Sequence, residues 1–455
     1  MEINPQIFRE YDIRGVVDKD LTPDVVQRLG QGFGTHMANL GRFNIVVGMD
    51  GRLSSNLFRE ALIQGLISTG CHVVDIGLCP TPVYYFSIFH LDKDGGIMVT
   101  GSHNPPEFNG FKVSVGKTTI FGEEIQNLRR LIEKVQFAAG EGNLSQEEVI
   151  RPYLHHIKKN IHLEKKIRVV IDAGNGTAGM VAGPLLRDLG CDVDELYCEI
   201  DGRFPNHFPD PTIPSNLRDL IETVKKIGAD VGIGYDGDAD RIGVVDNGGN
   251  IIWGDQLMIL FAREILKNEK GATFVAEVKC SQNLFTDIEK HGGKAIMWRT
   301  GHSLIKEKMK EERAVLGGEM SGHIFFADRY YGYDDAIYAS CRLTELLSKT
   351  DRKLSQLLDD IPKAFNTPEI RVECPDEIKF RVVEKIKEEL RKNYPIIDVD
   401  GVRVIFKDGW GLVRASNTQP ALVLRFEALT QDRLREIKDL VEEKVEAAVS
   451  ALQGR

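Results

Sequence analysis

The sequence predicts an α/β protein of several domains, in which three related α/β domains with parallel or mixed sheets precede a smaller α+β domain. The first supporting observation is length. One hydrophobic core rarely serves more than about 250–300 residues, and this chain has 455, so it is expected to divide into domains. The second is that apolar strand segments alternate with helical segments, as in βαβ units. The third is that this alternation occurs three times before the pattern changes.

Each copy of the repeat has three apolar strand segments and a polar loop after the third. The segments are FNIVVGMDGR, GCHVVDIG and GGIMVTGSHNP in the first copy, KIRVVIDAGNGTAG, GCDVDELY and ADVGIGYDGDADR in the second, and TFVAEVKCSQ, GGKAIMWRTG and AVLGGEMSGH in the third. Ligands bind beyond the carboxyl ends of strands in open α/β sheets, so the three loops are expected to meet at one cleft. We predict these domains at residues 1–148, 149–250 and 251–362.

Residues 363–455 lack the repeat and form the fourth predicted domain. An apolar helical stripe comes first, formed by Phe380, Val383, Ile386 and Leu390. The segments 402–406 and 410–414 predict a β-hairpin, and 422–426 predicts a further strand. An amphipathic helix closes the chain, marked by Leu434, Ile437, Val441, Val445 and Ala448.

The composition excludes several classes of function. A net charge of −10 argues against a nucleic-acid surface. The N-terminal segment does not have the pattern of a signal peptide, and no apolar run approaches the ~18 residues that span a bilayer, so no membrane association is expected. The seven cysteines are odd in number and form no C-x-x-C pair, which favours reduced thiols and a cytoplasmic location. No heptad pattern suggests an oligomer, and we expect a monomer.

The first polar loop, TGSHNPP, carries Ser102 at the expected end of a strand. The two prolines restrict the backbone after it, and Gly101 permits close approach by a ligand. A serine-hydrolase elbow would need glycines at the positions of Thr100 and Asn104, so that template fails. A free hydroxyl is a weak nucleophile without a base or a metal. The remaining interpretations are a rigid turn, or a serine that carries a phosphoryl group and is itself the donor.

The second loop, YDGDADR, places Asp236, Asp238 and Asp240 at alternate positions before Arg241. Alternate carboxylates can converge on one hard cation through oxygen ligands. The EF-hand pattern fails, because it needs a glycine at 241 and a glutamate at 247. Mg²⁺ at this loop would act as a Lewis acid on a phosphoryl group, and Arg241 would neutralise charge on it. A solvated turn is the structural alternative.

The third and fourth loops suit a sugar phosphate. GGEMSGH supplies Glu319, Ser321 and His323 at alternate positions, a mixture that fits neighbouring sugar hydroxyls. RASNTQP offers a guanidinium group, two hydroxyls and an amide, a set of donors that suits a phosphate monoester. A glycine-rich turn and a capped turn are the structural alternatives. The residues of the fourth loop are Arg414, Ser416, Asn417 and Thr418.

Together the motifs TGSHNP, DGDADR, GEMSGH and RASNTQP, in this order, resemble those of the α-D-phosphohexomutase family, and most closely its bacterial phosphomannomutase/phosphoglucomutase branch. The resemblance covers essentially the whole chain. It implies four domains around a central cleft, namely three related α/β domains with mixed or parallel sheets and a C-terminal α+β domain with a small antiparallel sheet. The repeat, found independently, agrees with this arrangement.

The resemblance also implies roles for single residues. Ser102 would be the phosphoserine and, with Asp236, Asp238 and Asp240, would bind one Mg²⁺ ion. The other catalytic residues implied are Arg14, Lys112, Arg241 and His302. The substrate-binding residues implied are Tyr11, Lys279, Glu319, Ser321, His323, Arg414, Ser416, Asn417 and Thr418.

The expected reaction is a two-transfer cycle on a hexose phosphate of mannose or glucose. Phospho-Ser102 would phosphorylate a hexose 1- or 6-phosphate to the hexose 1,6-bisphosphate, which turns over in the cleft and returns its other phosphate. Lys112 and His302 are both candidates for proton transfer. The alternatives are a phosphoglucosamine mutase, against which Met320 argues mildly, a phosphatase, and a non-catalytic sugar-phosphate-binding protein of the same fold.

Overall fold

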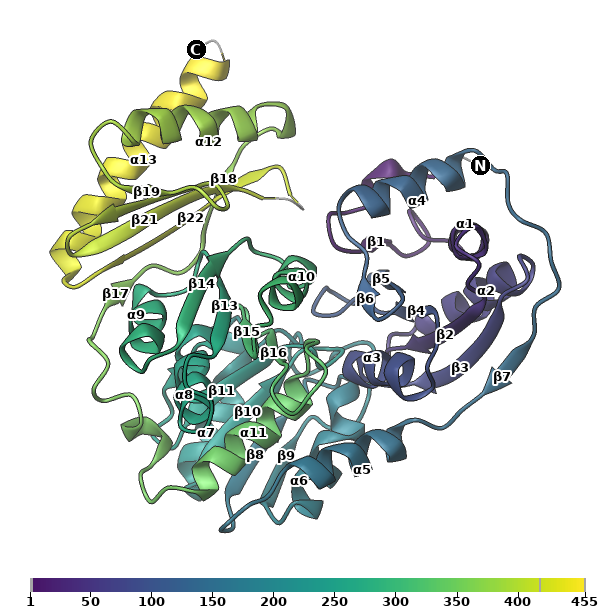
Figure 1. Cartoon of the computed structure of the whole chain (residues 1–455), viewed down its shortest axis with the longest axis horizontal. Coiled ribbons are helices and arrows are strands. Elements are labelled where there is room, and N and C mark those ends of the chain that lie inside the picture. Colours follow the sequence, from purple (N-terminus) through teal and green to yellow (C-terminus); the bar gives the residue numbers. More distant parts are fainter. Residues whose placement is uncertain (1–2, 417–418, 454–455) are drawn as a thin grey trace.

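The computed structural model describes residues 3–416 and 419–453, and it contains four β-sheets that follow one another along the chain (Figure 1). The first domain holds the sheet β1-β5-β4-β2-β3-β7, with β6 paired to β5. Its elements are β1 (Ile13–Val16), α1 (Pro23–Asn39), β2 (Asn44–Met49), α2 (Ser55–Ile67), β3 (His72–Leu78), α3 (Thr81–His90), β4 (Gly95–Val99), β5 (Phe108–Val115), β6 (Thr118–Thr119), α4 (Glu123–Glu133) and β7 (Leu144–Gln146).

The second and third domains hold smaller sheets, ordered β12-β11-β10-β8-β9 and β14-β13-β15-β16. The elements of the second are α5 (Ile150–Asn160), β8 (Arg168–Asp172), α6 (Ala182–Asp188), β9 (Asp192–Leu196), α7 (Arg218–Ile227), β10 (Val231–Tyr235), β11 (Ile242–Asp246) and β12 (Ile251–Ile252). Those of the third are α8 (Gly254–Leu266), β13 (Thr273–Glu277), α9 (Gln282–Lys290), β14 (Lys294–Trp298), α10 (His302–Glu312), β15 (Leu316–Gly318), β16 (Ile324–Phe326) and α11 (Ala336–Ser348).

The predicted repeat is confirmed by the topology of these three sheets. In each, the first strand of the repeat lies in the middle and pairs in parallel with the second and third, giving the orders β4-β2-β3, β10-β8-β9 and β15-β13-β14. An antiparallel strand, β5, β11 or β16, then pairs with the third strand. The polar loops are the connections inside these hairpins. They therefore all leave the carboxyl ends of their parallel strands, where α/β sheets bind ligands.

The fourth domain is an antiparallel sheet covered by two helices, as the sequence predicts. Its strand order is β17-β22-β21-β20-β19, with β18 also paired to β22. Its elements are β17 (Phe365–Asn366), β18 (Ile370–Glu373), α12 (Asp376–Leu390), β19 (Ile396–Ile397), β20 (Val402–Phe406), β21 (Gly409–Ala415), β22 (Ala421–Ala428) and α13 (Gln431–Gln453). One detail differs from the prediction. Phe380 is 57% exposed, because the buried face of α12 runs through Val382, Val383, Ile386 and Leu390 instead.

The domains differ in how they are joined. One core runs continuously through parts of the first three domains, from Val46 and Tyr84 through Val169 to Phe274, and the first domain has a second core around Phe33 and Phe58. The fourth domain has its own core and touches the third through a small apolar cluster of Val278, Trp410 and Leu412. In Figure 1 the first and fourth domains lie apart, and the second and third lie between and below them.

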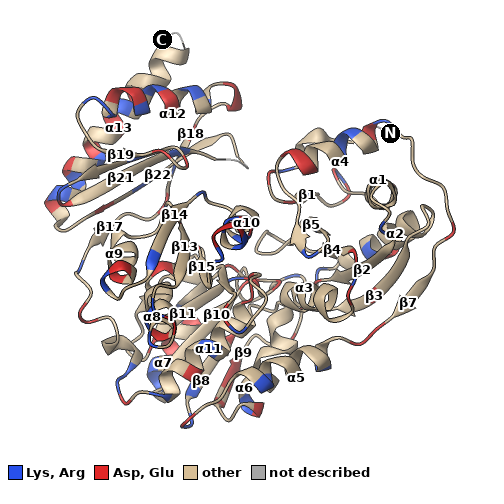
Figure 2. Cartoon of the chain, viewed as in Figure 1, with Lys and Arg blue, Asp and Glu red and all other residues tan. Residues whose placement is uncertain are grey.

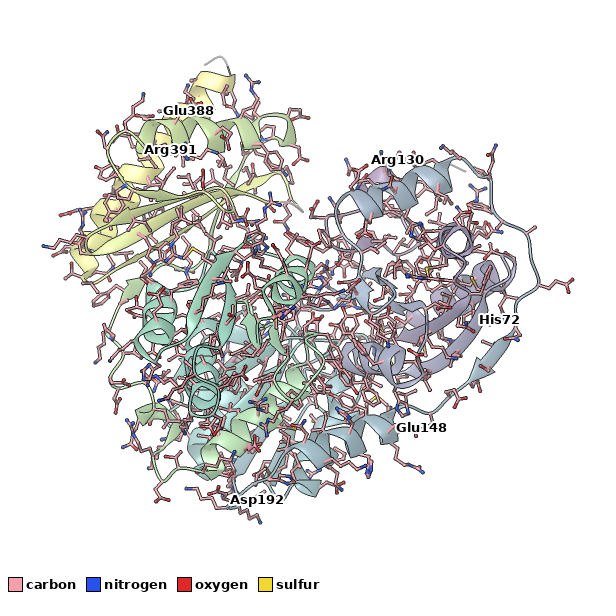
Figure 3. The ribbon with its side chains drawn as sticks, in the orientation of Figure 1. His72, Arg130, Glu148, Asp192, Glu388 and Arg391 are labelled. Carbon is pink, nitrogen blue, oxygen red and sulfur yellow. The ribbon has the colours of Figure 1, made fainter. Side chains whose placement is uncertain are left out.

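Charged side chains of both signs are spread over the outer surfaces. Figure 2 shows blue and red segments interspersed along α12 and α13, and Figure 3 shows that charged residues such as Arg130 and Glu388 lie on the periphery. Within the described residues, no helix combines the length and apolarity needed to span a membrane.

Candidate active site

Ser102 lies at the centre of the first loop and contacts the second loop directly. Its side chain is 2% exposed, and its Oγ donates a hydrogen bond to Asp236 Oδ2 at 2.8 Å. The backbone of Ser102 has φ +49°, a left-handed conformation that costs a non-glycine residue about 1 kcal/mol. Its backbone N–H donates to Thr100 Oγ1 at 2.9 Å. The hydroxyl is therefore presented from a strained turn, as is frequent at functional sites.

Arg52 holds this turn in place, and sequence reasoning missed it. The buried guanidinium donates to the backbone carbonyls of Ser102 at 2.8 Å, Pro105 at 2.7 Å and Phe108 at 2.9 Å. It also contacts Asp50 at 3.2 Å. A Cβ at Gly101 would lie only 2.5 Å from Arg52 Nε. The predicted close approach at Gly101 thus exists, but the approaching group is this arginine.

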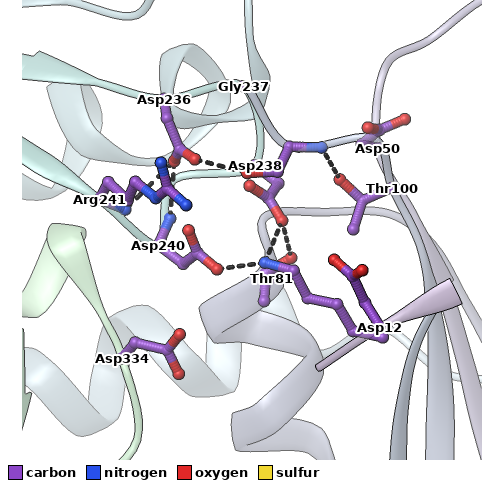
Figure 4. Close-up of polar contacts among 12 residues, drawn as sticks. Asp12, Asp50, Thr81, Thr100, Asp236, Gly237, Asp238, Asp240, Arg241 and Asp334 are labelled. Carbon is purple, nitrogen blue, oxygen red and sulfur yellow. Dashed lines mark hydrogen bonds and ion pairs between the residues drawn. The ribbon is translucent and has the colours of Figure 1, made fainter. Parts of the chain in front are cut away.

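The three aspartates of the second loop are fully buried and converge. Asp236, Asp238 and Asp240 offer carboxylate oxygens that all lie within 4.8 Å of one another. The loop is folded around Asp236 Oδ1, which accepts the backbone N–H groups of Asp240 at 3.0 Å and Arg241 at 3.1 Å. Figure 4 shows the carboxylates directed toward the first domain. The solvated-turn interpretation is wrong, because these carboxylates have no exposure to water.

The first domain supplies the partners of these carboxylates. Lys112 Nζ, on β5, contacts Asp238 Oδ2 at 2.7 Å and also pairs with Asp240. Thr81 Oγ1, at the start of α3, donates to Asp238 Oδ2 at 2.6 Å (Figure 4). Burial and the neighbouring Asp240 and Asp238 raise the pKa of Asp236 well above its ordinary value. Although burial opposes the charged form, the carboxylates raise the pKa of Lys112, so it stays cationic.

This cluster fits a divalent cation. Asp238 Oδ1 and Asp240 Oδ1 are buried without a hydrogen-bond partner among the described residues, which is costly for polar atoms unless something binds them. Three carboxylates close together favour Mg²⁺ or another hard cation, which prefers oxygen ligands. A bound cation would also remove the mutual repulsion that raises the pKa of Asp236.

The third loop is linked to the second through Arg241. Arg241 Nε lies 2.9 Å from His323 Nε2. Glu319 Oε1 accepts the backbone N–H of Gly301 at 2.6 Å, and Ser321 Oγ donates to Glu319 Oε2 at 3.2 Å. The alternate spacing in GEMSGH therefore brings a carboxylate, a hydroxyl and an imidazole together at the end of β15.

The segment 299–303 joins the remaining predicted residues. Tyr11 OH donates to the carbonyl of Thr300 at 2.6 Å. A Cβ at Gly301 would lie only 2.4 Å from Cζ of the Tyr11 ring, so the ring packs directly against this glycine. His302 begins α10 and stacks on His323, with 5.5 Å between the ring centres. Burial and Lys306 lower the pKa of His302 well below its ordinary value, so its imidazole is neutral near pH 7.

Asp334 is a second residue that sequence reasoning missed. It is fully buried, and its Oδ2 lies 3.2 Å from His323 Nδ1 and 3.7 Å from His302 Nδ1. Lys306 Nζ contacts its other oxygen at 3.1 Å. Because one carboxylate faces both imidazoles, it can fix their orientation.

The fourth domain reaches this site through Arg414, on β21. Arg414 Nε donates to Asp400 Oδ2 at 2.9 Å, and the same oxygen accepts the backbone N–H of Thr300 at 3.1 Å. Ser416 is buried, and its Oγ accepts the N–H of Gln419 at 3.2 Å. Lys279 pairs with Glu369 at 3.1 Å and lies 3.4 Å from Glu277. Asn417 and Thr418 lie outside the described residues.

Arg14 lies beside the first loop, where it contacts Asp12 and the side chain of Asn104. The structure thus connects the predicted residues from the first three loops in one chain of contacts: Ser102 to Asp236, Asp236 to Arg241, and Arg241 to His323.

Of the residues that sequence reasoning missed, Arg52 lies in the sequence MDGR, at the carboxyl end of β2. This position at the end of a strand was the signal by which it could have been found. Asp334 stands in an unremarkable YDD sequence that carries no such signal.

Comparison with protein-family models decides the family. Four models match in succession: phosphoglucomutase/phosphomannomutase alpha/beta/alpha domain I over residues 5–139, domain II over 151–249, domain III over 253–365, and the C-terminal domain over 369–444. The chain belongs to the phosphoglucomutase/phosphomannomutase family. It is accordingly a hexose-phosphate mutase, an isomerase that relocates a phosphoryl group.

Individual relatives agree over the whole chain. The phosphomannomutase/phosphoglucomutase of Pseudomonas aeruginosa is 46% identical over 447 residues, covering 98% of this chain and 96% of the relative. A phosphoglucomutase of Neisseria gonorrhoeae is 44% identical, with 98% of each protein covered. Among solved structures, a phosphoglucomutase/phosphomannomutase family protein from Burkholderia thailandensis superimposes with a TM-score of 0.94 at 42% identity, again covering 98% of each chain.

Proposed function

We propose that this enzyme interconverts the 1- and 6-phosphates of mannose and of glucose, with Ser102 as the residue that carries the transferred phosphoryl group. The observation that carries the proposal is the 2.8 Å contact between Ser102 Oγ and Asp236 of the buried aspartate cluster. The names of the relatives at 44–46% identity support both sugars.

In the first transfer the bond between phosphorus and Ser102 Oγ breaks, and a bond forms between phosphorus and the free hydroxyl oxygen of a hexose phosphate. The sugar hydroxyl loses its proton, Ser102 Oγ gains one, and the product is a hexose 1,6-bisphosphate. In the second transfer the bond between the other phosphorus and its sugar oxygen breaks, and that oxygen takes up a proton. The phosphorus then bonds to Ser102 Oγ, which loses its proton. Phosphoryl transfer depends mainly on positioning and charge neutralisation. The strained turn at Ser102, which Arg52 holds in place, supports the positioning of the serine.

Asp236, Asp238 and Asp240, with Ser102, are the residues that would hold Mg²⁺. When bound, this ion supplies Lewis-acid stabilisation of charge on the phosphoryl oxygens. The chain contributes fixed cations of its own. Lys112 stays protonated beside Asp238 and Asp240, so it acts as a positive charge and not as a base.

His302 is the better candidate for accepting the hydroxyl proton. Its pKa is lowered by burial and by Lys306, and its Nδ1 has no hydrogen-bond partner among the described residues. A neutral imidazole can take a proton, and Asp334 at 3.7 Å would stabilise the cation that results. Arg14 lies beside the first loop and is proposed to steer the phosphate.

The sugar and the phosphate that does not react are proposed to bind on the other side of the cleft. Glu319, Ser321 and His323 suit the sugar hydroxyls, and Tyr11 supports them through Thr300. Arg414, Ser416 and Lys279, with Asn417 and Thr418, supply the charge and donors for a phosphate monoester. These donors would bind either phosphate of a bisphosphate, as is required when one serine gives one phosphoryl group and receives the other.

We further propose that the enzyme works as a monomer in the cytoplasm, on small hexose phosphates alone. All seven cysteines are free, and six of them are buried, which is consistent with a reducing compartment.

A combined assay tests the proposal. The intact mass of the purified enzyme should show one phosphoryl group, which a short incubation with excess mannose 1-phosphate should transfer to the sugar. With Mg²⁺ and a trace of glucose 1,6-bisphosphate, the 6-phosphate of mannose and of glucose should form. Release of inorganic phosphate without isomer would indicate a phosphatase, and binding without turnover a non-catalytic protein. Preference for glucosamine 1-phosphate would indicate a phosphoglucosamine mutase. Each of these results contradicts the proposal.

A further inference from the structure

A second cavity lies between the first and third domains, apart from the residues assigned to the phosphoryl-transfer cleft. It has a volume of about 420 Å³, which lies in the range of small-molecule sites. Its walls come from α3, from the β5–β6 hairpin, from α10 and from the segment between β16 and α11. Figure 1 shows α10 on the side of the third domain that faces this hairpin. Thr119 Oγ1 and Ser303 Oγ, 2.9 Å apart, join the two domains where α10 begins.

The cavity is basic in an acidic protein. Lys117, Lys306, Lys310 and Arg313 line it, and no carboxylate is among its described lining residues. Two of these cations are already compensated, because Lys306 pairs with Asp334 at 3.1 Å and Lys117 pairs with Asp92 at 3.0 Å.

Lys310 and Arg313 are different. Neither has an ion pair or a side-chain hydrogen bond with any residue that the structure describes. Lys310 lies in the last turn of α10, Arg313 is the left-handed residue that ends this helix, and both line the cavity. Two uncompensated cations in one cavity wall suit a ligand with two or more negative charges, and the arginine can bind phosphate oxygens in a bidentate manner.

Aromatic rings form another part of the wall. Tyr331, one of the lining residues, is 38% exposed. It packs on Phe89 with 4.6 Å between ring centres and lies nearly parallel to Tyr333, at an angle of 8°. Such a set of rings offers a stacking surface for a flat ligand group. An anion alone would need no such surface.

We propose that this cavity binds an aromatic compound that carries a diphosphate, of the nucleoside diphosphate class. The flat base would lie against Tyr331, and the diphosphate would lie between Lys310 and Arg313. A bound ligand would bridge the first and third domains. Lys306, in the cavity wall, pairs with Asp334, and Asp334 contacts His302 and His323.

Binding of ADP to the full-length enzyme tests this site. Isothermal titration would be done in a saturating equilibrium mixture of glucose 1- and 6-phosphates, so that the cleft is filled. We expect saturable binding of ADP in the micromolar range, and at least tenfold weaker binding of pyrophosphate and of adenosine. The double substitution Lys310→Glu with Arg313→Glu should weaken ADP binding at least tenfold, while kcat/KM for glucose 1-phosphate stays unchanged.

Control substitutions test separately the contacts proposed for the diphosphate and for the flat base. Lys226→Glu changes another exposed lysine in the last turn of a helix, α7, and should leave ADP binding unchanged. Tyr331→Ala should weaken ADP binding but not pyrophosphate binding, whereas Phe380→Ala, at another exposed ring, should affect neither.

Several results would overturn the proposal: absence of ADP binding below about 1 mM, unchanged binding in the double variant, or ADP binding that is seen only when hexose phosphate is left out. Equal affinity for ADP and pyrophosphate would show a simple anion site and would also contradict it. Because the readout is binding, these results do not depend on whether the proposed mutase mechanism holds.

Discussion

The two sides of the cleft are held in different ways. On the side proposed for phosphoryl transfer, Ser102 and the three aspartates are at most 2% exposed, and contacts between the first and second domains hold them beside the core that these domains share. On the side proposed to hold the other phosphate, Arg414 belongs to a domain that shares no continuous core with the third. The two domains are joined by one small apolar cluster and by hydrogen bonds such as those from Arg403 to the carbonyls of Val278 and Cys280. The comparison suggests that the donor side is preorganised, while the side that must accept both ends of the substrate is attached more loosely.

Removal of the serine hydroxyl should have the largest effect. Ser102→Ala leaves no oxygen to carry the phosphoryl group, so kcat should fall about 10³-fold or more. The isomerase assay with glucose 1,6-bisphosphate present measures it. Thermal stability should stay within a few degrees of wild type. Wild-type turnover in this variant would refute the role of Ser102 as donor.

Loss of the arginine clamp should come next. Arg52→Met leaves the buried carbonyls of Ser102, Pro105 and Phe108 without their donor, which costs about 3 kcal/mol of unfolding free energy. The serine also loses its fixed position, so kcat should fall about 10- to 100-fold with little change in KM. Arg59→Met is the control, since Arg59 pairs with buried Asp75 in the same domain away from the loop. An equal loss of kcat in both variants would contradict a positioning role.

On the looser side, Arg414→Lys should act mainly on binding. Lysine keeps the charge but cannot form two parallel hydrogen bonds to a phosphate, so KM should rise about tenfold, equivalent to about 1.4 kcal/mol. The value of kcat should change less than threefold. Steady-state kinetics with glucose 1-phosphate separates the two constants, and a fall in kcat alone would show that this side is as preorganised as the other.

The smallest effect should come from the pair that ties the fourth domain to the third. Burial opposes ionisation of Glu369, but Lys279 and Arg371 lower its pKa to about 2. The pKa of Glu369 thus lies below the ordinary 4.5, so the pair stabilises the folded protein above pH 4.5, and this stabilisation is lost as the pH falls toward 2. After allowance for partial exposure, Glu369→Gln should lower the unfolding free energy by about 1 kcal/mol at pH 7.

Denaturant unfolding of both proteins at pH 7 and pH 3.5 measures this difference, which should be smaller at the lower pH. Glu373→Gln, an exposed change in the neighbouring strand β18, is the control. A difference that grows as the pH falls would contradict the assignment.

Much of the architecture follows from the amino-acid sequence. The strand repeats predict three similar sheets because buried parallel strands need continuous apolar runs, and the hairpin and amphipathic helix of the last domain have equally local patterns. Ser102 and the three aspartates could be found because their chemistry is concentrated in a few consecutive residues. Phe380 was misplaced because a short helical stripe leaves the exact buried face undetermined within one residue.

What only the tertiary structure decided is which distant groups act on one another. Arg52 contacts Ser102 across 50 residues of chain, Lys112 meets Asp238 across 126, and Asp334 faces two imidazoles from different elements. No local pattern marks such pairs, because burial and electrostatic contact depend on how domains pack and not on neighbours in the chain. The sequence thus named the groups that we propose to react, and the packing of the domains determined their charge states and their partners.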